Sequence, residues 1–103
     1  MTKTGERMSE AEVHRVKGEL LFALPTPDAA RAEAAFREAL EVARRQSAKS
    51  WELRAATSLA RLLRERERRD EARALLAPVY DWFTEGFDTA DLKDAKTLLK
   101  QLS

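Results

Sequence analysis

Apolar side chains recur every three or four residues along almost the whole chain. Val13, Val16, Leu20 and Leu24, for example, form a stripe with spacings of three, four and four residues. This is the period of one face of an α-helix, whereas a half-buried strand would alternate every two residues. The same period recurs in four further segments, so the pattern predicts five helices and no sheet.

Proline, glycine and small polar residues divide the chain between these stripes. Ser9, Thr26 and Ser50 stand where the N-caps of the first three helices are expected. Pro78 lies inside the fourth segment, where it is expected to kink or end the helix. Short connections of about two to six residues make neighbouring helices antiparallel. The predicted helices cover about residues 9–24, 26–46, 50–68, 70–84 and 89–102.

Composition supports an all-α fold in one domain. Ala, Glu, Lys, Leu and Arg supply 63 of the 103 residues, and isoleucine and asparagine are absent. Such usage favours helices over strands. The hydrophobic share of 44% is too high for a disordered chain. Cysteine is absent, which excludes disulfides, thiol catalysis and zinc–thiolate sites.

The helices contain an internal repeat. An offset of 40 residues matches Ala32, Phe36 and Ala39 to Ala72, Leu76 and Val79. An offset of 42 residues matches Lys17, Gly18 and Leu21 to Leu59, Ala60 and Leu63. The last helix follows less well, with Ala95 and Leu98 in the places of Ala60 and Leu63 at an offset of 35. Small residues in such positions let two helix backbones approach closely, and a repeat of this length indicates stacked helical hairpins.

The repeated pattern resembles the tetratricopeptide repeat, W-x2-L-G-x2-Y followed by A-x3-F-x2-A, in its longer kinesin-light-chain form. The resemblance implies an α-solenoid of antiparallel helix hairpins. Residues 1–103 then form one domain, with a first repeat at 9–46, a second at 50–84 and a C-terminal capping helix at 89–102. The chain departs from the pattern in lacking the Trp and Tyr of the first helices, and Glu67 stands at a turn position where glycine is usual.

Longer stretches resemble a second family. A-F-R-E-A-L-E-V-A-R-R-Q and S-W-E-L-R-A-A-T-S-L-A-R-L are similar to the C-terminal end of large bacterial predicted ATPases, often fused to adenylate or guanylate cyclase. This resemblance implies a regulatory segment of a larger signalling protein. It carries over a scaffold role and no catalytic residue.

The first helix of each hairpin is expected to line an inner, partner-binding face. Arg54, Thr57, Arg61 and Arg64 share one helix face at spacings of three, four and three residues. Arginine forks suit the carboxylates of an acidic or C-terminal peptide. The predicted groove residues are Glu12, Arg15, Glu19, Phe22, Arg54, Thr57, Arg61, Arg64 and Lys96. The alternative is that these are ordinary solvated helix residues.

Self-association is the competing hypothesis. Two and a half repeats leave apolar faces at both ends, and a second copy could cover them as a homo-oligomer. The candidate contact residues are Trp82, Leu92, Leu99 and Leu102. The Arg-rich stretch 61–73 and the acidic stretch 81–94 could assist such pairing.

Other functions find little support. Lone His14 has no second ligand at metal-site spacing, and Asp91 with Asp94 is best explained by the helix dipole. No enzyme motif or phosphate loop is present, so we expect no catalysis and no cofactor. A net charge of +1 argues against nucleic acid, and no apolar run reaches membrane-span length. A cytoplasmic protein that binds a protein or peptide is therefore expected.

Overall fold

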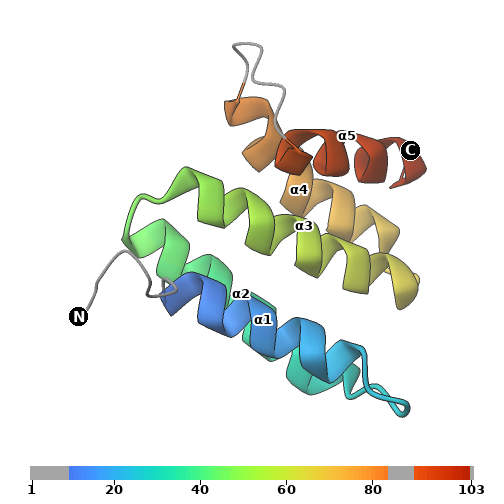
Figure 1. The fold of residues 1–103 in the computed structure, drawn as a ribbon. Helices are drawn as coiled ribbons and strands as arrows, with labels where there is room; N and C mark the ends of the chain where they lie inside the picture. The colour runs from blue at the N-terminus through green and yellow to red at the C-terminus, as the bar shows by residue number, and fades with distance from the viewer. Residues whose placement is uncertain (1–9, 84–89, 103) are drawn as a thin grey trace, which may run out of the picture.

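The computed structural model describes residues 10–83 and 90–102, which are 85% helical and contain no strand. The prediction of an all-α fold with five helices is confirmed (Figure 1). The helices are α1 (Glu10–Phe22), α2 (Ala29–Arg45), α3 (Lys49–Glu65), α4 (Arg69–Trp82) and α5 (Ala90–Leu102).

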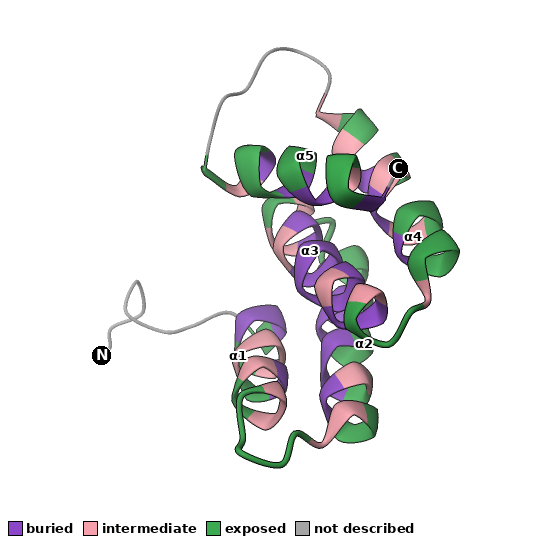
Figure 2. Cartoon of the chain, turned by 90° about the vertical axis from the view of Figure 1, so that its right-hand side faces the viewer, coloured by how far each residue is buried: buried purple, intermediate pink, exposed green. Residues whose placement is uncertain are grey.

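The helices form two layers in a flat molecule with extents of 44 × 40 × 22 Å. Helices α1, α3 and α5 lie in one layer, and α2 and α4 lie behind them in Figure 1. The central helix α3 contacts all four of the others. Ten of its 17 residues are buried, which is the purple core of Figure 2. The chain is therefore a stack of helical hairpins built around α3.

The close approach of the two helices in the first hairpin depends on a glycine. A Cβ atom at Gly18 of α1 would lie 2.5 Å from a ring carbon of Phe36 on α2. Phe36 itself is completely buried in the core. The small residue predicted from the repeat therefore faces its own hairpin partner, and the ring of Phe36 fills the space a larger side chain would need.

Helix α1 does not turn its apolar stripe toward the core. Val13 and Leu20 are 49% and 66% exposed, and Leu24 just beyond the helix is also exposed. Ala11, Glu12 and Gly18 are the buried residues of this helix. The stripe thus predicted the helix and its period, but it does not mark the face that packs inside the molecule.

The helix starts differ from the predicted caps. Asp28, not Thr26, caps α2, and its Oδ1 atom accepts the backbone N–H of Arg31 over 3.1 Å. Helix α3 starts one residue before Ser50, after Ala48, which provides no side-chain cap. Ser9 lies outside the described residues. Helix α4 continues past Pro78 to Trp82, so the early end considered for it does not occur.

The turns from α2 to α3 and from α3 to α4 have the same geometry. Ser47 and Glu67 take left-handed backbone angles, with φ of 53° and 61°. In each turn the next residue donates its N–H to the carbonyl five residues back, over 2.9 Å in the first and 2.8 Å in the second. This is the Schellman ending that glycine usually supplies. In both turns, therefore, a residue with a Cβ atom takes a backbone conformation that is unfavourable for any residue except glycine.

Replacing Glu67 by glycine is expected to stabilise the protein by about 0.5–1 kcal/mol. A left-handed residue with a Cβ costs about 1–2 kcal/mol, and the extra entropy of an unfolded glycine offsets part of the gain. Urea unfolding measures the effect. Glu67→Ala is the control, because it removes the carboxylate and keeps the Cβ. Equal stability of the Gly and Ala variants would contradict the strain argument.

Candidate functional site

Two adjoining hollows lie on the face formed by α1, α3 and α5. The first has a volume of about 280 Å³ and the second about 250 Å³. Arg61 and Asp94 line both of them. We call the combined surface the groove. Its lining residues are Arg15, Arg54, Thr57, Ser58, Arg61, Arg64, Asp91, Asp94, Thr97, Leu98 and Gln101.

One end of the groove is held together by a carboxylate between two arginines. Glu12 accepts two hydrogen bonds from Arg15, over 2.8 and 2.7 Å, and a third from Arg54 over 3.1 Å. The hydrogen bond from Arg15, with the charges of both guanidinium groups, holds the pKa of Glu12 below its usual value in spite of burial. This carboxylate is therefore ionised at neutral pH and joins α1 to α3.

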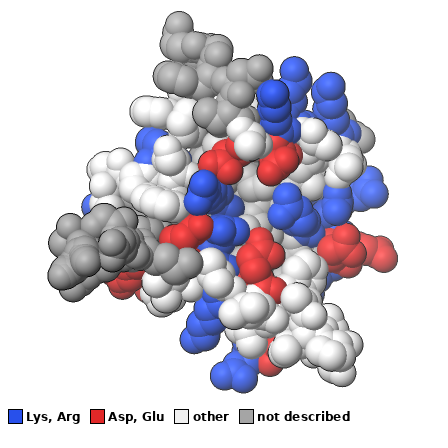
Figure 3. All heavy atoms as spheres, in the orientation of Figure 1, with Lys and Arg blue, Asp and Glu red and all other residues white. Residues whose placement is uncertain are grey.

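The same contacts continue across the layer. Arg54 also donates to Asp91 of α5 over 3.0 Å, so its guanidinium joins all three helices of this face. Ser58 donates to Glu19 over 2.8 Å. Space-filling Figure 3 shows this face, on which basic and acidic side chains alternate over the centre. Much of the charge in the groove is thus neutralised within the chain.

Arg61 is one of two charged groove residues for which this does not hold. It forms no ion pair with any residue in the described ranges 10–83 and 90–102, although it lines both hollows. Asp94 likewise has no ion pair there. The neighbouring Arg64, in contrast, contacts Glu65 over 3.4 Å and hydrogen-bonds Gln101. A cation and an anion without ion pairs among the described residues therefore line the same groove.

The structure brings five of the nine predicted groove residues into the lining. These are Arg15, Arg54, Thr57, Arg61 and Arg64. Glu12 and Glu19, both on α1, do not line the hollows but form ion pairs with the groove arginines Arg15 and Arg54. Phe22 packs half-buried against the core instead, and Lys96 is exposed on α5 and lines neither hollow.

Sequence reasoning included the last helix in the groove through Lys96, but it missed the α5 residues that line the groove. Asp91, Asp94, Thr97 and Gln101 line the groove from this helix. Their spacing of three, three and four residues places them on one helix face, a signal present in the sequence. Lys96 follows Asp94 by two residues and therefore points about 200° away around the helix.

The predicted self-association residues are mostly used inside the chain. Leu92 and Leu102 belong to the hydrophobic core, and Leu99 packs half-buried against it. These placements correct the expectation of an open apolar face on α5, because α5 packs against α3 and α4. Trp82 is 58% exposed and lies edge-on to Phe83, with Lys49 over its ring at 5.2 Å.

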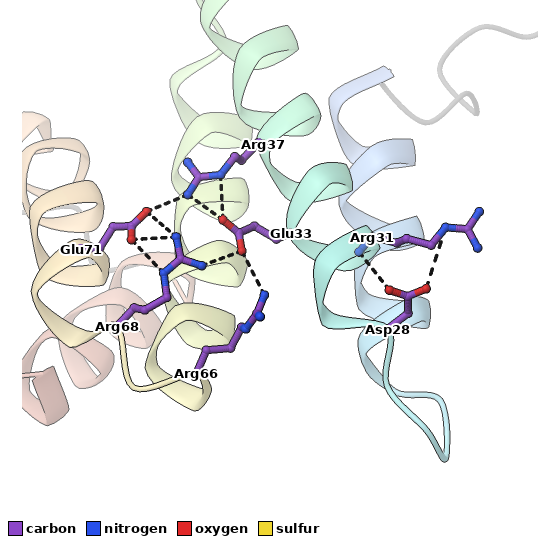
Figure 4. A network of polar contacts seen from close by, with 7 residues as sticks. All are labelled: Asp28, Arg31, Glu33, Arg37, Arg66, Arg68 and Glu71. Carbon is purple, nitrogen blue, oxygen red and sulfur yellow. Dashed lines mark hydrogen bonds and ion pairs between the residues drawn. The ribbon is translucent and has the colours of Figure 1, made fainter.

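A second polar network joins the hairpins at the far side of α3. Glu33 of α2 contacts Arg37 and Arg68 over 2.8 Å each, and Arg66 over 3.4 Å (Figure 4). Glu71 of α4 in turn binds Arg37 and Arg68 over 2.8 Å. Burial raises the pKa of Glu33, but hydrogen bonds from Arg68 and Arg37 outweigh it and the net shift is downward. We call these five residues the Glu33 network.

This network predicts acid sensitivity. A carboxyl group whose pKa is lowered on folding stabilises the protein above its unfolded pKa, and the stabilisation is lost as the pH falls through the folded value. The unfolding free energy is therefore expected to fall between pH 7 and pH 3, and less steeply in Glu33→Gln. Urea unfolding at a series of pH values measures this. Exposed Glu38, which has no ion pair among the described residues, supplies the control Glu38→Gln. An unchanged slope in Glu33→Gln would contradict the assignment.

Metal and membrane sites find no support in the described part of the chain. His14 lies 3.9 Å from Glu10, and no group of three potential metal ligands occurs there. Nor is any helix in residues 10–83 and 90–102 long and apolar enough to cross a membrane.

No protein-family model matches the chain, and comparisons with curated proteins and with solved structures find no match either. The function is therefore inferred from the geometry of the groove.

Proposed function

We propose that this chain is a non-catalytic protein–protein interaction module of the tetratricopeptide class, whose groove binds an acidic or C-terminal peptide. The observation that carries the proposal is Arg61. It is a cation at the junction of both hollows, and it forms no ion pair with a described residue.

The chemistry of the groove limits the kinds of ligand that it can bind. A guanidinium binds a carboxylate through two parallel hydrogen bonds, which gives direction as well as affinity. Arg15 and Arg54 already bind Glu12, so they position the groove wall and leave recognition to Arg61. Asp94, which lines the same two hollows, is suited to accept a peptide N–H. A short extended segment with one carboxylate fits this arrangement.

Labelled peptides provide the test. An acidic peptide with a free C-terminus, its C-terminal amide and a version with lysines in place of the acids would be compared by fluorescence anisotropy. Arg61→Glu should reduce binding of the acidic peptide by tenfold or more, which corresponds to about 1.4 kcal/mol. Arg31→Glu is the matched control, since Arg31 lies on α2 with a side chain that is 74% exposed. Equal binding by both variants, or no preference for the acidic peptide, would reject the proposal.

A regulatory segment of a larger ATPase or cyclase is the second proposal. The exposed apolar side chains of Val13, Leu20 and Leu24 favour it, because an exposed apolar patch marks a surface that binds another protein or domain. The buried leucines of α5 argue against pairing through that end. Light scattering on a sizing column distinguishes a monomer of 11.7 kDa from a dimer.

A further inference from the structure

The outer face of α1 is apolar and is not covered by any described helix. Helix α1 contacts only α2 and α3 within the described residues. On its other side lie exposed Val13 and Leu20, with Leu24 following the helix. Lys17 is also exposed there and forms no ion pair with a described residue. We call these four residues the α1 stripe.

The internal repeat allows the exposed positions of α1 to be compared with the equivalent positions of α3. At the offset of 42 residues Val13 corresponds to Ala55 and Leu20 to Leu62 in α3. Ala55 and Leu62 are 1% and 0% exposed, against 49% and 66% for their counterparts. The same helix position is thus buried in the second hairpin and open in the first.

The difference follows from what precedes each helix. Gly18 faces Phe36, so the side of α1 toward its own hairpin partner is occupied. Val13 and Leu20 lie about 140–160° around the helix from Gly18. Helix α3 has the hairpin of α1 and α2 packed ahead of it, and both contact it. No described helix takes that place for α1.

The other end of the stack is finished differently. After Ala90 at its start, the exposed residues of α5 are polar, and those outside the groove are Lys93, Lys96 and Lys100. A polar outer face is what ends a stack of repeats in water. The stack is therefore capped at α5 and open at α1.

We infer that the α1 stripe is a stacking surface for the second helix of another helical hairpin, which packs on α1 as α2 packs on α3. The partner helix is amphipathic, carries small apolar residues at helical spacing as α2 does with Ala35 and Ala39, and places a carboxylate opposite Lys17. In α3 the counterpart of Lys17 is Leu59, so the carboxylate is specific to this partner.

A second copy of the chain fits this surface less well. A twofold pair of α1 helices would bring two Lys17 side chains to within about one helical turn of each other in the middle of the shared stripe. Like charges at that distance oppose association. Three large apolar side chains also fall well short of the roughly 800 Å² per partner of a standard interface. A hairpin that is joined to α1 by a turn, as α2 is joined to α3, needs less area, because the connection keeps it beside the stripe.

A tandem duplication of residues 7–48 tests the inference. At the 42-residue offset Arg7 takes the place of Lys49, so the duplicated α2 leads through its own turn into the original α1. The added hairpin then meets the α1 stripe of the inner copy. We expect a single cooperative transition with a higher Tm than that of the original chain.

Leu20→Glu supplies the matched comparison. In the inner copy it buries a charge against the added helix, and the Tm should fall by about 5–10 °C. In the outer copy, and in the original chain, the same substitution lies in water and should shift the Tm by less than about 2 °C. Equal shifts in the two copies would overturn the inference. So would an original chain that is a dimer and becomes a monomer on Leu20→Glu, because the occupant would then be a second copy.

Discussion

Replacing Phe36 by alanine is expected to lower the free energy of unfolding by about 3–5 kcal/mol. The ring is completely buried and is the largest side chain of the core with no exposure. Its removal loses the burial of the ring and leaves a cavity that rigid helices cannot fill. For a domain of this size such a loss is a large part of the total stability. Urea unfolding followed by circular dichroism measures the difference.

Gly18 gives this prediction a control that tests the contact itself. Gly18→Ala places a Cβ atom 2.5 Å from the ring of Phe36 and should destabilise the original chain, although alanine is the better helix former. In a Phe36→Leu background the ring edge is gone, so the same substitution should cost less or stabilise. A cost for Gly18→Ala that is the same in both backgrounds would show that the close contact is not what limits this position.

The helical period predicted most of the fold. Four of the five helices turn the expected residues inward, such as Phe36, Leu63 and Leu76. Helix α1 differs because it is apolar on two sides, and a period alone cannot say which side meets the partner helix. The small residues Ala11 and Gly18 mark the buried side, since close packing of two backbones requires them.

The helix ends were harder to predict, because several polar residues compete for each start. Asp28 caps α2 two residues after Thr26, and Ala48 precedes α3 with no capping side chain at all. The turn geometry, with left-handed Ser47 and Glu67, sets where the next helix begins. Side-chain preferences of about 1 kcal/mol do not outweigh a turn fixed by packing on both sides.

The groove was predictable only in its position on the stack. Common-face spacing on α3 grouped Arg54, Thr57 and Arg61, and the structure has all three along one hollow. The sequence could not show that Glu12 binds both Arg15 and Arg54, because the contact with Arg54 joins residues 42 positions apart. The offset of 35 residues that was used for α5 also placed Lys96, rather than Asp94, on the inner face. Which groove arginine has no ion pair within residues 10–83 and 90–102 thus depends on the tertiary structure.

Leu62→Ala is expected to cost about 2–5 kcal/mol, whereas Leu20→Ala should change the stability by less than about 0.5 kcal/mol. The two leucines hold the same place in successive hairpins, at the 42-residue offset. Leu62 is completely buried in the core, while Leu20 is 66% exposed. Truncating a buried leucine leaves a cavity, and truncating an exposed one does not.

Urea unfolding of both variants, with unchanged m-values as the sign of two-state behaviour, measures the contrast. Similar losses for the two substitutions would mean that Leu20 is already covered in solution, by a second copy or by another part of the chain. Light scattering on the original chain separates these cases, since only a second copy raises the mass. A small loss of unfolding free energy at Leu20 together with a large one at Leu62 means that truncation is costly only where another hairpin packs on this helix position. Burying the α1 stripe under a partner helix would then add a stabilisation that the chain alone does not have.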